Sequence, residues 1–434
     1  MKKDKTFRQM VTLLTANFFG MFGSGMLSFA IGLYILHKTG SALGMGITLM
    51  VGPLVALVLT PFVGYMVDTR SHRAIMIGAQ IGTSIGLLLF ALAFMWWPAF
   101  YYPEVIGLLI ILTITDRFLS TALSASLVTL FPTDVLQRVN SLNQSVSSLA
   151  QLISPIIGAV IYSFVSIGTF ALVEIVFELL TLVCILRLNF TVAKPAAESA
   201  TAEMPATPAA KESLLANFAE GLRYLQGNRL ILLSCLFGAG INFLFAAVNV
   251  GLPYLQVTVL KMPNTLYGIT DSGFAVGMIL GGVALSMITL KHHPFLVSLW
   301  GIMLLGSVLT LLGIPEQMAW PMMGNVFFYG LLNVANGIIL VVINTPISTM
   351  MQKLIPQAMQ GRVFMLTGTI SSLLMPLGTL VFGFLFDRMA AWIILLGVGL
   401  LTLLMSFVTV VYVHGRHCWQ SFPHNPLSAS PIWQ

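Results

Sequence analysis

The sequence has little charge and few cysteines. Charged residues make up 8% of its 434 residues, against roughly a quarter in a soluble domain, whereas hydrophobic residues make up 57%. Such a chain cannot form a water-soluble globule, so the lipid bilayer must be its solvent. Its three cysteines, Cys184, Cys235 and Cys418, have no metal-like spacing and suggest neither a disulfide framework nor a metal site. A Gly-x-x-x-x-Gly-Lys-Ser/Thr loop is also missing, so neither a bound nucleotide nor any other cofactor is expected.

Long apolar runs fill most of the chain. A helix needs about 20 apolar residues to cross the roughly 30 Å of bilayer hydrocarbon. The runs show no period-two alternation, which argues against a membrane-spanning β-barrel. Charges, prolines and glycines divide the chain into twelve segments, at about 10–36, 42–67, 75–97, 104–130, 139–165, 168–187, 229–257, 266–290, 294–314, 318–351, 362–386 and 390–413. The expected fold class is an all-α integral membrane protein with twelve transmembrane helices.

The basic residues predict the orientation. With the N-terminus in the cytoplasm, 16 of the 20 Lys and Arg residues fall in inner connections or tails. Only Lys38, Lys261 and Arg388 fall outside, and Arg117 lies within a span. The positive-inside rule therefore places both termini in the cytoplasm. This placement also explains the net charge of +6 without a nucleic-acid partner.

A polar stretch divides the spans into two groups of six. Residues 191–213 are rich in Ala, Pro, Ser, Thr and Glu and predict a cytoplasmic linker. The predicted domains are a six-helix bundle at 1–190, the linker region at 191–228, a second bundle at 229–413 and a cytoplasmic tail at 414–434. Leu214, Leu215, Phe218, Leu222 and Leu225 recur at helical spacing and predict a short amphipathic helix within the linker region.

The two halves repeat each other. A shift of 224 residues aligns seven identities within 18 positions, from Pro132 with Pro356 to Leu149 with Leu373. Both matched segments enter the membrane from the cytoplasm, so the repeat is parallel, with an axis along the membrane normal. Such a duplication is expected to place a cavity between two bundles.

Two spans carry stripes of polar residues. The fifth has Asn140, Asn143, Gln144, Ser147, Gln151 and Ser154 on one helix face, and the tenth has Asn325, Asn333, Asn336 and Asn344 within an arc of about 100°. Unpaired amides in hydrocarbon cost several kcal/mol, so each stripe must face another helix or a water-filled cavity. Both readings stay open, and a cavity lining is the expected one.

Five ionisable residues lie within spans: Asp116, Arg117, Glu174, Glu178 and Asp271. Charges buried in a bilayer are costly and commonly mark substrate or ion paths, although a buried ion pair can also serve packing alone. Arg117 lies near the midplane and needs a partner, for which Glu174 or Glu178 is better placed than its neighbour Asp116. The two glutamates share one helix face, and two adjacent carboxylates tend to hold a proton. Asp271 is closer to a span end.

The connection after the second span resembles a loop motif of the major facilitator superfamily. Gly64, Asp68 and Arg73 match this motif, and Ser71 stands where the family usually has glycine. The resemblance implies that Asp68 and the basic residues gate inward- and outward-facing states. The corresponding loop of the second half has Lys291, His292 and His293 and no aspartate.

Two further motifs narrow the resemblance. The sequence from Arg117 to Thr121 looks like the fourth-span motif of proton-coupled members, and Ser154, Pro155 and Gly158 resemble the fifth-span antiporter motif. Segments 131–144 and 218–225 are similar to the drug:proton antiporter branch of macrolide-efflux-type proteins. The resemblance implies the major facilitator fold in a bacterial cytoplasmic membrane, with proton antiport of small amphipathic compounds by alternating access. The expected partners are protons, these compounds and membrane lipids. The protein is expected to be a monomer.

Two alternatives remain open. An importer or facilitator of a small metabolite would be favoured by more charged cavity residues than are present here. A membrane enzyme acting on lipids would need clustered His, Asp or Glu at one membrane face, whereas all seven histidines lie in predicted loops or the tail without metal spacing. The sequence therefore predicts a transporter and no enzyme.

Overall fold

The structure is a computed structural model. It describes residues 2–190, 229–288, 293–318, 320–355, 366–371 and 373–415, with single residues 223, 225, 227 and 363. Within this part there is no strand, and 12 helices are long and apolar enough to cross a membrane, which confirms the predicted fold class. The predicted linker at 191–213 and most of the amphipathic helix after it lie outside the described residues, as does the tail beyond residue 415.

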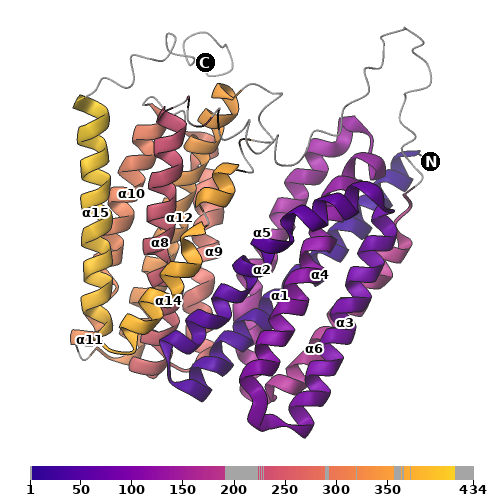
Figure 1. Ribbon diagram of the computed structural model, residues 1–434, viewed down its shortest axis with the longest axis horizontal. Coiled ribbons are helices and arrows are strands. Elements are labelled where there is room, and N and C mark those ends of the chain that lie inside the picture. Colours follow the sequence, from indigo (N-terminus) through magenta and orange to yellow (C-terminus); the bar gives the residue numbers. More distant parts are fainter. Residues whose placement is uncertain are drawn as a thin grey trace. The chain divides into compact units, whose positions relative to one another are not determined.

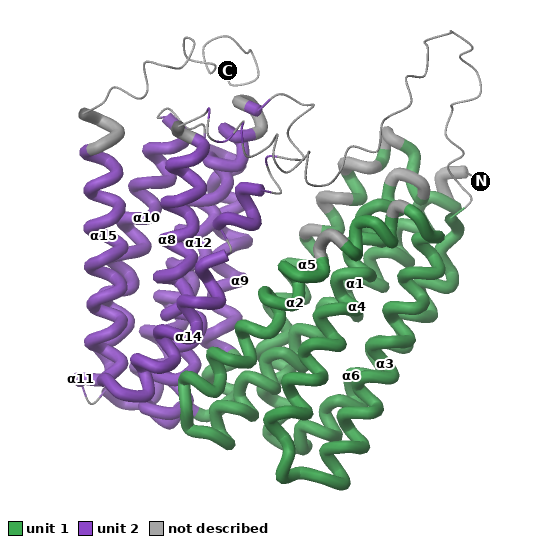
Figure 2. Tube along the Cα trace, in the orientation of Figure 1, with its two compact units in different colours: residues 1–214, 263–268 green, residues 215–262, 269–434 purple. Residues whose placement is uncertain are grey.

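The chain forms two compact units, shown in different colours in Figure 2. Unit 1 comprises residues 1–214 and 263–268, and unit 2 comprises residues 215–262 and 269–434. Unit 1 contains the helices α1 (Lys2–Thr39), α2 (Ala42–Thr69), α3 (His72–Trp96), η1 (Pro98–Phe100), α4 (Tyr101–Leu130), α5 (Thr133–Phe164) and α6 (Ile167–Arg187) (Figure 1).

Several helices extend beyond the predicted apolar spans. Helix α1 begins at Lys2 rather than near residue 10, and α5 begins at Thr133 rather than near 139. Hydropathy detects only the part of a helix that lies in hydrocarbon, and the hydrogen-bonded backbone continues past it. Side-chain caps mark two helix starts in unit 1. The Ser41 hydroxyl accepts from Gly44 N at 3.1 Å, and the Ser166 hydroxyl accepts from Thr169 N at 3.3 Å.

Unit 2 contains helices related to those of unit 1 by the sequence repeat. They are α8 (Arg229–Pro253), the π-helix η2 (Tyr254–Val259), α9 (Asn264–Met287), α10 (Pro294–Leu311), α11 (Ile314–Gln317), α12 (Met322–Leu354), α14 (Met375–Phe386) and α15 (Ala391–Gly415). The first turn of α9 belongs to unit 1 by its contacts. A further candidate span, Leu366–Phe386, includes α14.

The repeat is visible in helix packing within each unit. In unit 1, α1 packs on α5, and α3 packs on both α4 and α6. In unit 2, α8 packs on α14, and α10 packs on both α12 and α15. Helices α6 and α15 begin at Ile167 and Ala391, which are separated by the repeat shift of 224 residues. The parallel duplication read from sequence therefore corresponds to equivalent helix pairs.

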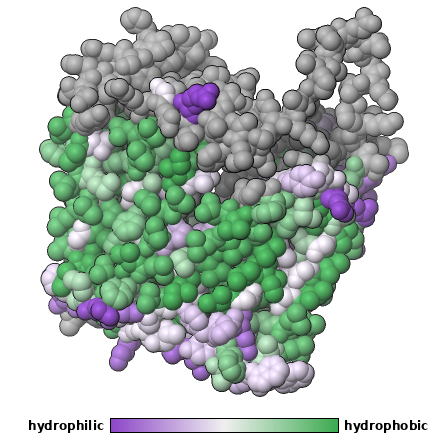
Figure 3. All heavy atoms as spheres, viewed as in Figure 1, coloured by the Kyte–Doolittle hydropathy of each residue, from purple (hydrophilic) through white to green (hydrophobic). Residues whose placement is uncertain are grey.

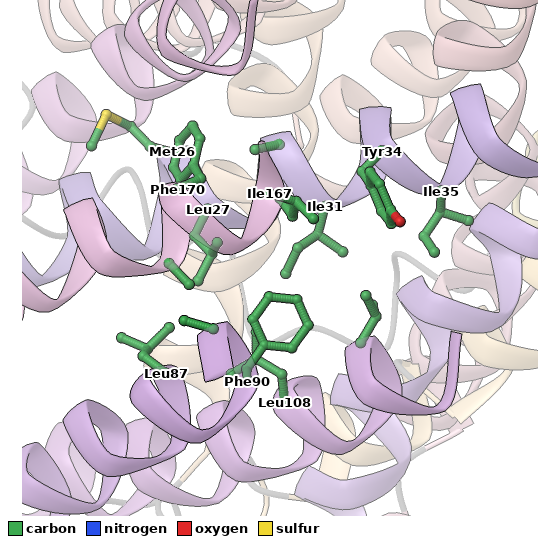
Figure 4. Packing of buried hydrophobic residues seen from close by; sticks show 14 of the residues in the cluster. Met26, Leu27, Ile31, Tyr34, Ile35, Leu87, Phe90, Leu108, Ile167 and Phe170 are labelled. Atoms are coloured by element: carbon green, nitrogen blue, oxygen red, sulfur yellow. The ribbon is translucent and has the colours of Figure 1, made fainter. Parts of the chain in front are cut away.

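Large apolar side chains fill the core of unit 1. Met26, Leu27 and Ile31 of α1 lie against Phe90 of α3 and Phe170 of α6, all at least nine-tenths buried (Figure 4). Dispersion contacts and close packing hold helices together here, because lipid tails are as apolar as these side chains.

The outer faces of the helices are also apolar. Ile85, Leu88, Leu89 and Leu92 of α3 are exposed, although their helix packs on α4 and α6 with its other face. Figure 3 shows hydrophobic residues over the visible sides of each unit and hydrophilic residues near the ends. Such a surface suits hydrocarbon and would aggregate in water.

Candidate functional site

The polar face of α6 is turned into unit 1. Glu174, Glu178 and Thr181 recur at i, i+4 and i+7, so they share one side of the helix. Glu174 is 1% exposed and Glu178 is 4% exposed. Both Glu174 carboxylate oxygens are buried and have no hydrogen-bond partner among the described residues. These two carboxyl groups therefore lie inside the bundle of unit 1.

Helix α1 meets this face with glycines. A methyl group built at Gly23 would lie 2.6 Å from each carboxylate oxygen of Glu174. One turn earlier, a methyl group at Gly20 would lie 3.7 Å from Thr181, which is an ordinary contact. The Thr181 hydroxyl also lies 3.5 Å from the carbonyl oxygen of Ala16. Small residues on α1 thus let the polar side chains of α6 approach its backbone.

Helix α3 covers the glutamates from another side. The amide of Gln80, 0% exposed, donates from Nε2 to the backbone oxygen of Glu178 at 3.1 Å. Three residues on, Thr83 donates to the hydroxyl of Thr115 in α4 at 2.8 Å. These two bonds connect α6, α3 and α4 next to Asp116.

Asp116 completes a group of three carboxylates. It lies on α4 close enough to interact electrostatically with both Glu174 and Glu178. Unlike them, Asp116 is exposed at the surface of the bundle. No group of three or more His, Cys, Asp or Glu side chains in the described ranges is arranged to hold a metal ion.

Arg117 does not take the partner expected for it. Its side chain is exposed on α4, and the described residues contain no ion pair between it and Glu174 or Glu178. The reason is geometric, because the glutamates face α1 and α3, whereas Arg117 is on an open side of α4. Its charge instead acts on its sequence neighbour Asp116.

The ionisable residues of unit 1 have uncharged counterparts in unit 2. The repeat shift places Val398 and Thr402 of α15 at the positions of Glu174 and Glu178. It places Leu340 and Val341 at the positions of Asp116 and Arg117. Since α15 packs on α10 as α6 packs on α3, this kind of packing does not require charged groups.

The polar stripe of α5 divides between two surroundings. Asn143, Ser147 and Ser154 fall on one side of the stripe at about 100° per residue, and Gln151 falls on the other. Ser147 accepts from the Asn17 amide at 3.2 Å, and Ser154 donates to the Phe22 oxygen at 3.0 Å, so this side joins α5 to α1. Gln151 is exposed.

The remaining side chains of the stripe are only partly visible. Asn143 has a buried side-chain oxygen without a described partner. The side chains of Asn140 and Gln144 lie outside the described set. One side of this stripe therefore makes a contact between helices, and a cavity lining at Gln151 stays a prediction.

The antiporter-like motif serves the contact between α1 and α5. A methyl group at Gly158 would lie 3.1 Å from the Met26 oxygen, so the helices touch closely there. Ser154, which replaces a usual glycine, places its hydroxyl against Gly25. Pro155 lies within the continuous helix α5.

Three asparagines of α12, Asn325, Asn333 and Asn336, are buried, whereas Asn344 is exposed. Asn333 is 5% exposed and donates to the Thr270 oxygen of α9 at 2.8 Å. Asn336 is 1% exposed and its amide has no partner among the described residues. The expected cavity lining at Asn333 is corrected to a contact between helices, because close glycine packing brings α9 and α12 together beside it.

The other predicted residues lie on other elements of the two units. Asp271 is half-buried on α9, in unit 2. Gly64 has open space where a side chain would begin, and the side chain of Asp68 lies outside the described set. Arg73 is exposed and donates to the backbone oxygen of Leu186 at 3.2 Å, near the end of α6.

Sequence reasoning missed three residues beside the site. Gly23 and Gln80 contact the glutamates, and Asn17 binds the α5 stripe. Gln80 was detectable as an amide in an apolar span. Asn17 was detectable because Asn17-Phe18 recurs as Asn242-Phe243. Gly23 carried no distinguishing signal among 38 glycines.

Comparison with known proteins identifies the family. The family model described as Major Facilitator Superfamily matches residues 13–379. The chain belongs to the Major Facilitator Superfamily. Its twelve candidate spans and two repeated units are therefore those of a multi-pass membrane transporter of this superfamily, and the family resemblance read from the sequence is confirmed.

Curated relatives within the Major Facilitator Superfamily are efflux proteins. Macrolide efflux protein A of Streptococcus pyogenes is 28% identical over 382 residues, covering 86% of this chain and 89% of that protein. Macrolide efflux protein A of Enterococcus faecalis is 26% identical over 345 residues, covering 78% of this chain and 99% of that protein. The fold is also similar to the crystal structure of a POT family transporter in complex with 5-aminolevulinic acid, with a TM-score of 0.70 and 15% identity over 94% of this chain and 96% of that one.

Proposed function

We propose that this transporter exports small amphipathic compounds across a bacterial cytoplasmic membrane in exchange for protons. The observation that carries the proposal is the group of carboxylates at Asp116, Glu174 and Glu178. Burying Glu174 and Glu178 costs stability, and the counterparts of all three carboxylates in unit 2 are apolar or a hydroxyl. Because helix packing does not require these charged groups, a role in transport best explains why they are present.

The direction of transport rests on the relatives. Both curated relatives described above are named as efflux proteins. The antiporter-like motif of Ser154, Pro155 and Gly158 supports the same direction, and the sequence that starts at Arg117 resembles that of proton-coupled members. Macrolides are therefore the first compounds to test.

Proton exchange follows from the chemistry of the carboxyl group. A carboxylate in a low-dielectric interior gains a proton easily and loses it when a cation or water approaches. Asp116 is exposed, whereas Glu174 and Glu178 are buried, so Asp116 is the member that meets solvent or substrate first. Alternating access would then expose the group to one side of the membrane at a time.

Neutral substitutions test the role of the carboxylates. Glu174→Gln, Glu178→Gln and Asp116→Asn are made singly in purified protein reconstituted into vesicles. We expect at least one variant to lose proton-driven accumulation of radiolabelled erythromycin while it keeps downhill exchange. If all three retain full proton-driven accumulation, these residues do not couple transport to protons.

The unit 2 counterparts supply matched controls. Glu174→Val and Glu178→Thr introduce the residues that occupy these positions in α15. We expect folded protein that has lost coupling of transport to protons.

The wild type is tested with a sodium gradient in place of a proton gradient. Accumulation that survives collapse of the proton gradient, or that needs sodium, would refute proton antiport, and net inward movement would favour an importer.

A further inference from the structure

Glu174 lies beside the carboxyl group of Glu178. Both of its oxygens are enclosed and have no partner among the described residues. Two donors on the facing sides of α3 and α6 bind other acceptors. The Gln80 amide donates to Glu178 O, and the Thr181 hydroxyl donates to Phe177 O at 3.0 Å. The remaining Gln80 oxygen is itself an unpartnered acceptor.

These surroundings indicate the protonation state of the Glu174 carboxyl group. An ionised carboxylate has only acceptors, whereas the protonated group brings one O–H donor of its own. A buried anion with neither a donor nor a cation beside it is far more costly than a neutral acid. In this packing Glu174 therefore requires a proton, carried on its own carboxyl group or shared with Glu178.

The carboxyl group packs directly against Gly23 of α1. Its oxygens occupy the space that any larger side chain at position 23 would need. If α1 moves away from α6 at this point, water reaches Glu174 and can stabilise its charged form. If the helices close again, the charge must be neutralised first.

We propose that the contact between Gly23 and Glu174 is a proton-dependent latch between α1 and α6, closed when Glu174 is protonated and open when Glu174 is charged. This latch rests on the proposed function, and Gly23 is the residue that positions Glu174 within it. Gly23 is not a proton carrier. It links the protonation of Glu174 to the separation of two helices within unit 1.

Few titratable groups face Glu174. Glu178 on α6 and Asp116 on α4 act on it electrostatically. The contacts described above between these glutamates and helices α1 and α3 involve Gly23 and Gln80, which do not titrate. A pH effect that depends on Gly23 therefore reports on Glu174 and its two acidic neighbours.

Two glycines on the same helix provide a matched pair of variants. Gly23→Ala places a methyl group against the Glu174 carboxyl, while Gly20→Ala places one at an ordinary 3.7 Å from Thr181. Both variants keep the backbone helical and add the same group. Only Gly23→Ala should disturb the latch.

The readout is the proton concentration required for half-maximal driven transport of erythromycin in vesicles. For Gly23→Ala we expect this concentration to rise by about tenfold, within the usual range of coupling for side chains in direct contact. Gly20→Ala should match the wild type. An unchanged requirement in Gly23→Ala, or equal shifts in both variants, would overturn the latch.

A rescue experiment covers the case in which Gly23→Ala simply folds poorly. Glu174→Asp shortens the side chain by one carbon–carbon bond, about 1.5 Å, and should make room for the added methyl group. We expect the double variant Gly23→Ala/Glu174→Asp to be closer to the wild type than Gly23→Ala alone, in both yield and proton requirement. Strictly additive effects would contradict a direct contact.

The two proposals can fail separately. If collapse of the proton gradient leaves wild-type erythromycin transport unchanged, the proposed function fails. If wild-type transport is proton-driven and Gly23→Ala behaves as Gly20→Ala does, the function stands and the latch fails.

Discussion

Arg73, for which the loop motif predicts a gating role, also makes a structural contact. Its guanidinium donates to the Leu186 oxygen, one of the carbonyls that α6 leaves unpaired at its C-terminal end. A cation at a helix C-terminus also interacts favourably with the helix dipole, by about 0.3–1 kcal/mol at exposed sites. The loop motif that predicted a gating role therefore contains a helix cap as well.

Substitutions in this loop separate the two roles. We expect Asp68→Asn and Arg73→Ala to reduce the rate of transport more than equilibrium binding of erythromycin, because gating concerns the populations of states. Arg73→Ala should also lower the thermal unfolding temperature slightly through the lost cap. Arg73→Lys keeps the charge and serves as the control.

The gating hypothesis has a clear failing outcome. Binding that decreases as steeply as transport, in variants whose unfolding temperature is unchanged, would mean that the loop shapes the binding site itself. A decrease in both that follows the unfolding temperature would leave only the structural role of the cap.

At the scale of elements, α10 begins with a titratable cap. The Nδ1 atom of His293 accepts from Phe295 N at 3.3 Å, just before the span that starts at Pro294. Burial lowers the pKa of His293 below its ordinary value. A lowered pKa and an accepting ring nitrogen agree physically, because a protonated ring could only donate at that atom.

This cap predicts a pH dependence. The folded state binds a proton at His293 less readily than the unfolded state, so the contribution to stability is fully present above the ordinary histidine pKa of about 6.5. It is lost as the pH decreases through the lowered folded value. We expect the thermal unfolding temperature in detergent to decrease over this acidic range.

A non-titrating cap isolates the effect. Asn is a good helix N-cap and accepts a hydrogen bond without ionising in this range. His293→Asn should therefore remove that part of the pH dependence while it preserves stability near neutrality. If the wild type and this variant lose stability in parallel on acidification, His293 does not carry the effect.

Helix-to-helix contacts in unit 2 depend on glycines rather than charges. Gly273, Gly277 and Gly281 are spaced by four residues along α9 and lie against the backbone of α12. A methyl group at Gly281 would lie 3.0 Å from the Ile338 Cα, whereas at Gly282 it would meet nothing within 4 Å. Close backbone approach of this kind is a common way for membrane helices to associate.

For the whole molecule, the duplication combines similar packing with different chemistry. Equivalent helix pairs support both units, but within the spans the carboxylates of unit 1 correspond to uncharged residues in unit 2. Proton coupling, as proposed, therefore belongs to unit 1. Unit 2 would follow through the shared transport cycle.

The orientation of the whole chain can be tested by cysteine labelling. The predicted placement of 16 basic residues inside and 3 outside places Lys38 outside and Thr201 in the cytoplasm. In a variant without the native cysteines, a membrane-impermeant maleimide added to intact cells should label Lys38→Cys and not Thr201→Cys. Labelling after cell lysis provides the control for both positions, and the reverse pattern in intact cells would contradict the orientation.

The sequence by itself determined the spans, the repeat and the family. Crossing a bilayer demands about 20 apolar residues in every helix, so this signal is local and strong. Two other signals can also be read from short stretches of sequence. They are the repeat that matches Arg138 with Arg362 and the loop motif of Gly64, Asp68 and Arg73. The ionisable residues were visible for the same reason, since a charge in an apolar run is conspicuous.

Only the tertiary structure decided what those residues face. Helical periodicity places Glu174 and Glu178 on one side of α6, but the approach of α1 and α3 determines that this side meets Gly23 and Gln80 rather than Arg117. The stripe on α5 likewise divides according to where α1 packs. A period fixes direction around one helix axis, whereas the partner depends on how several helices pack together, and no single segment contains that information.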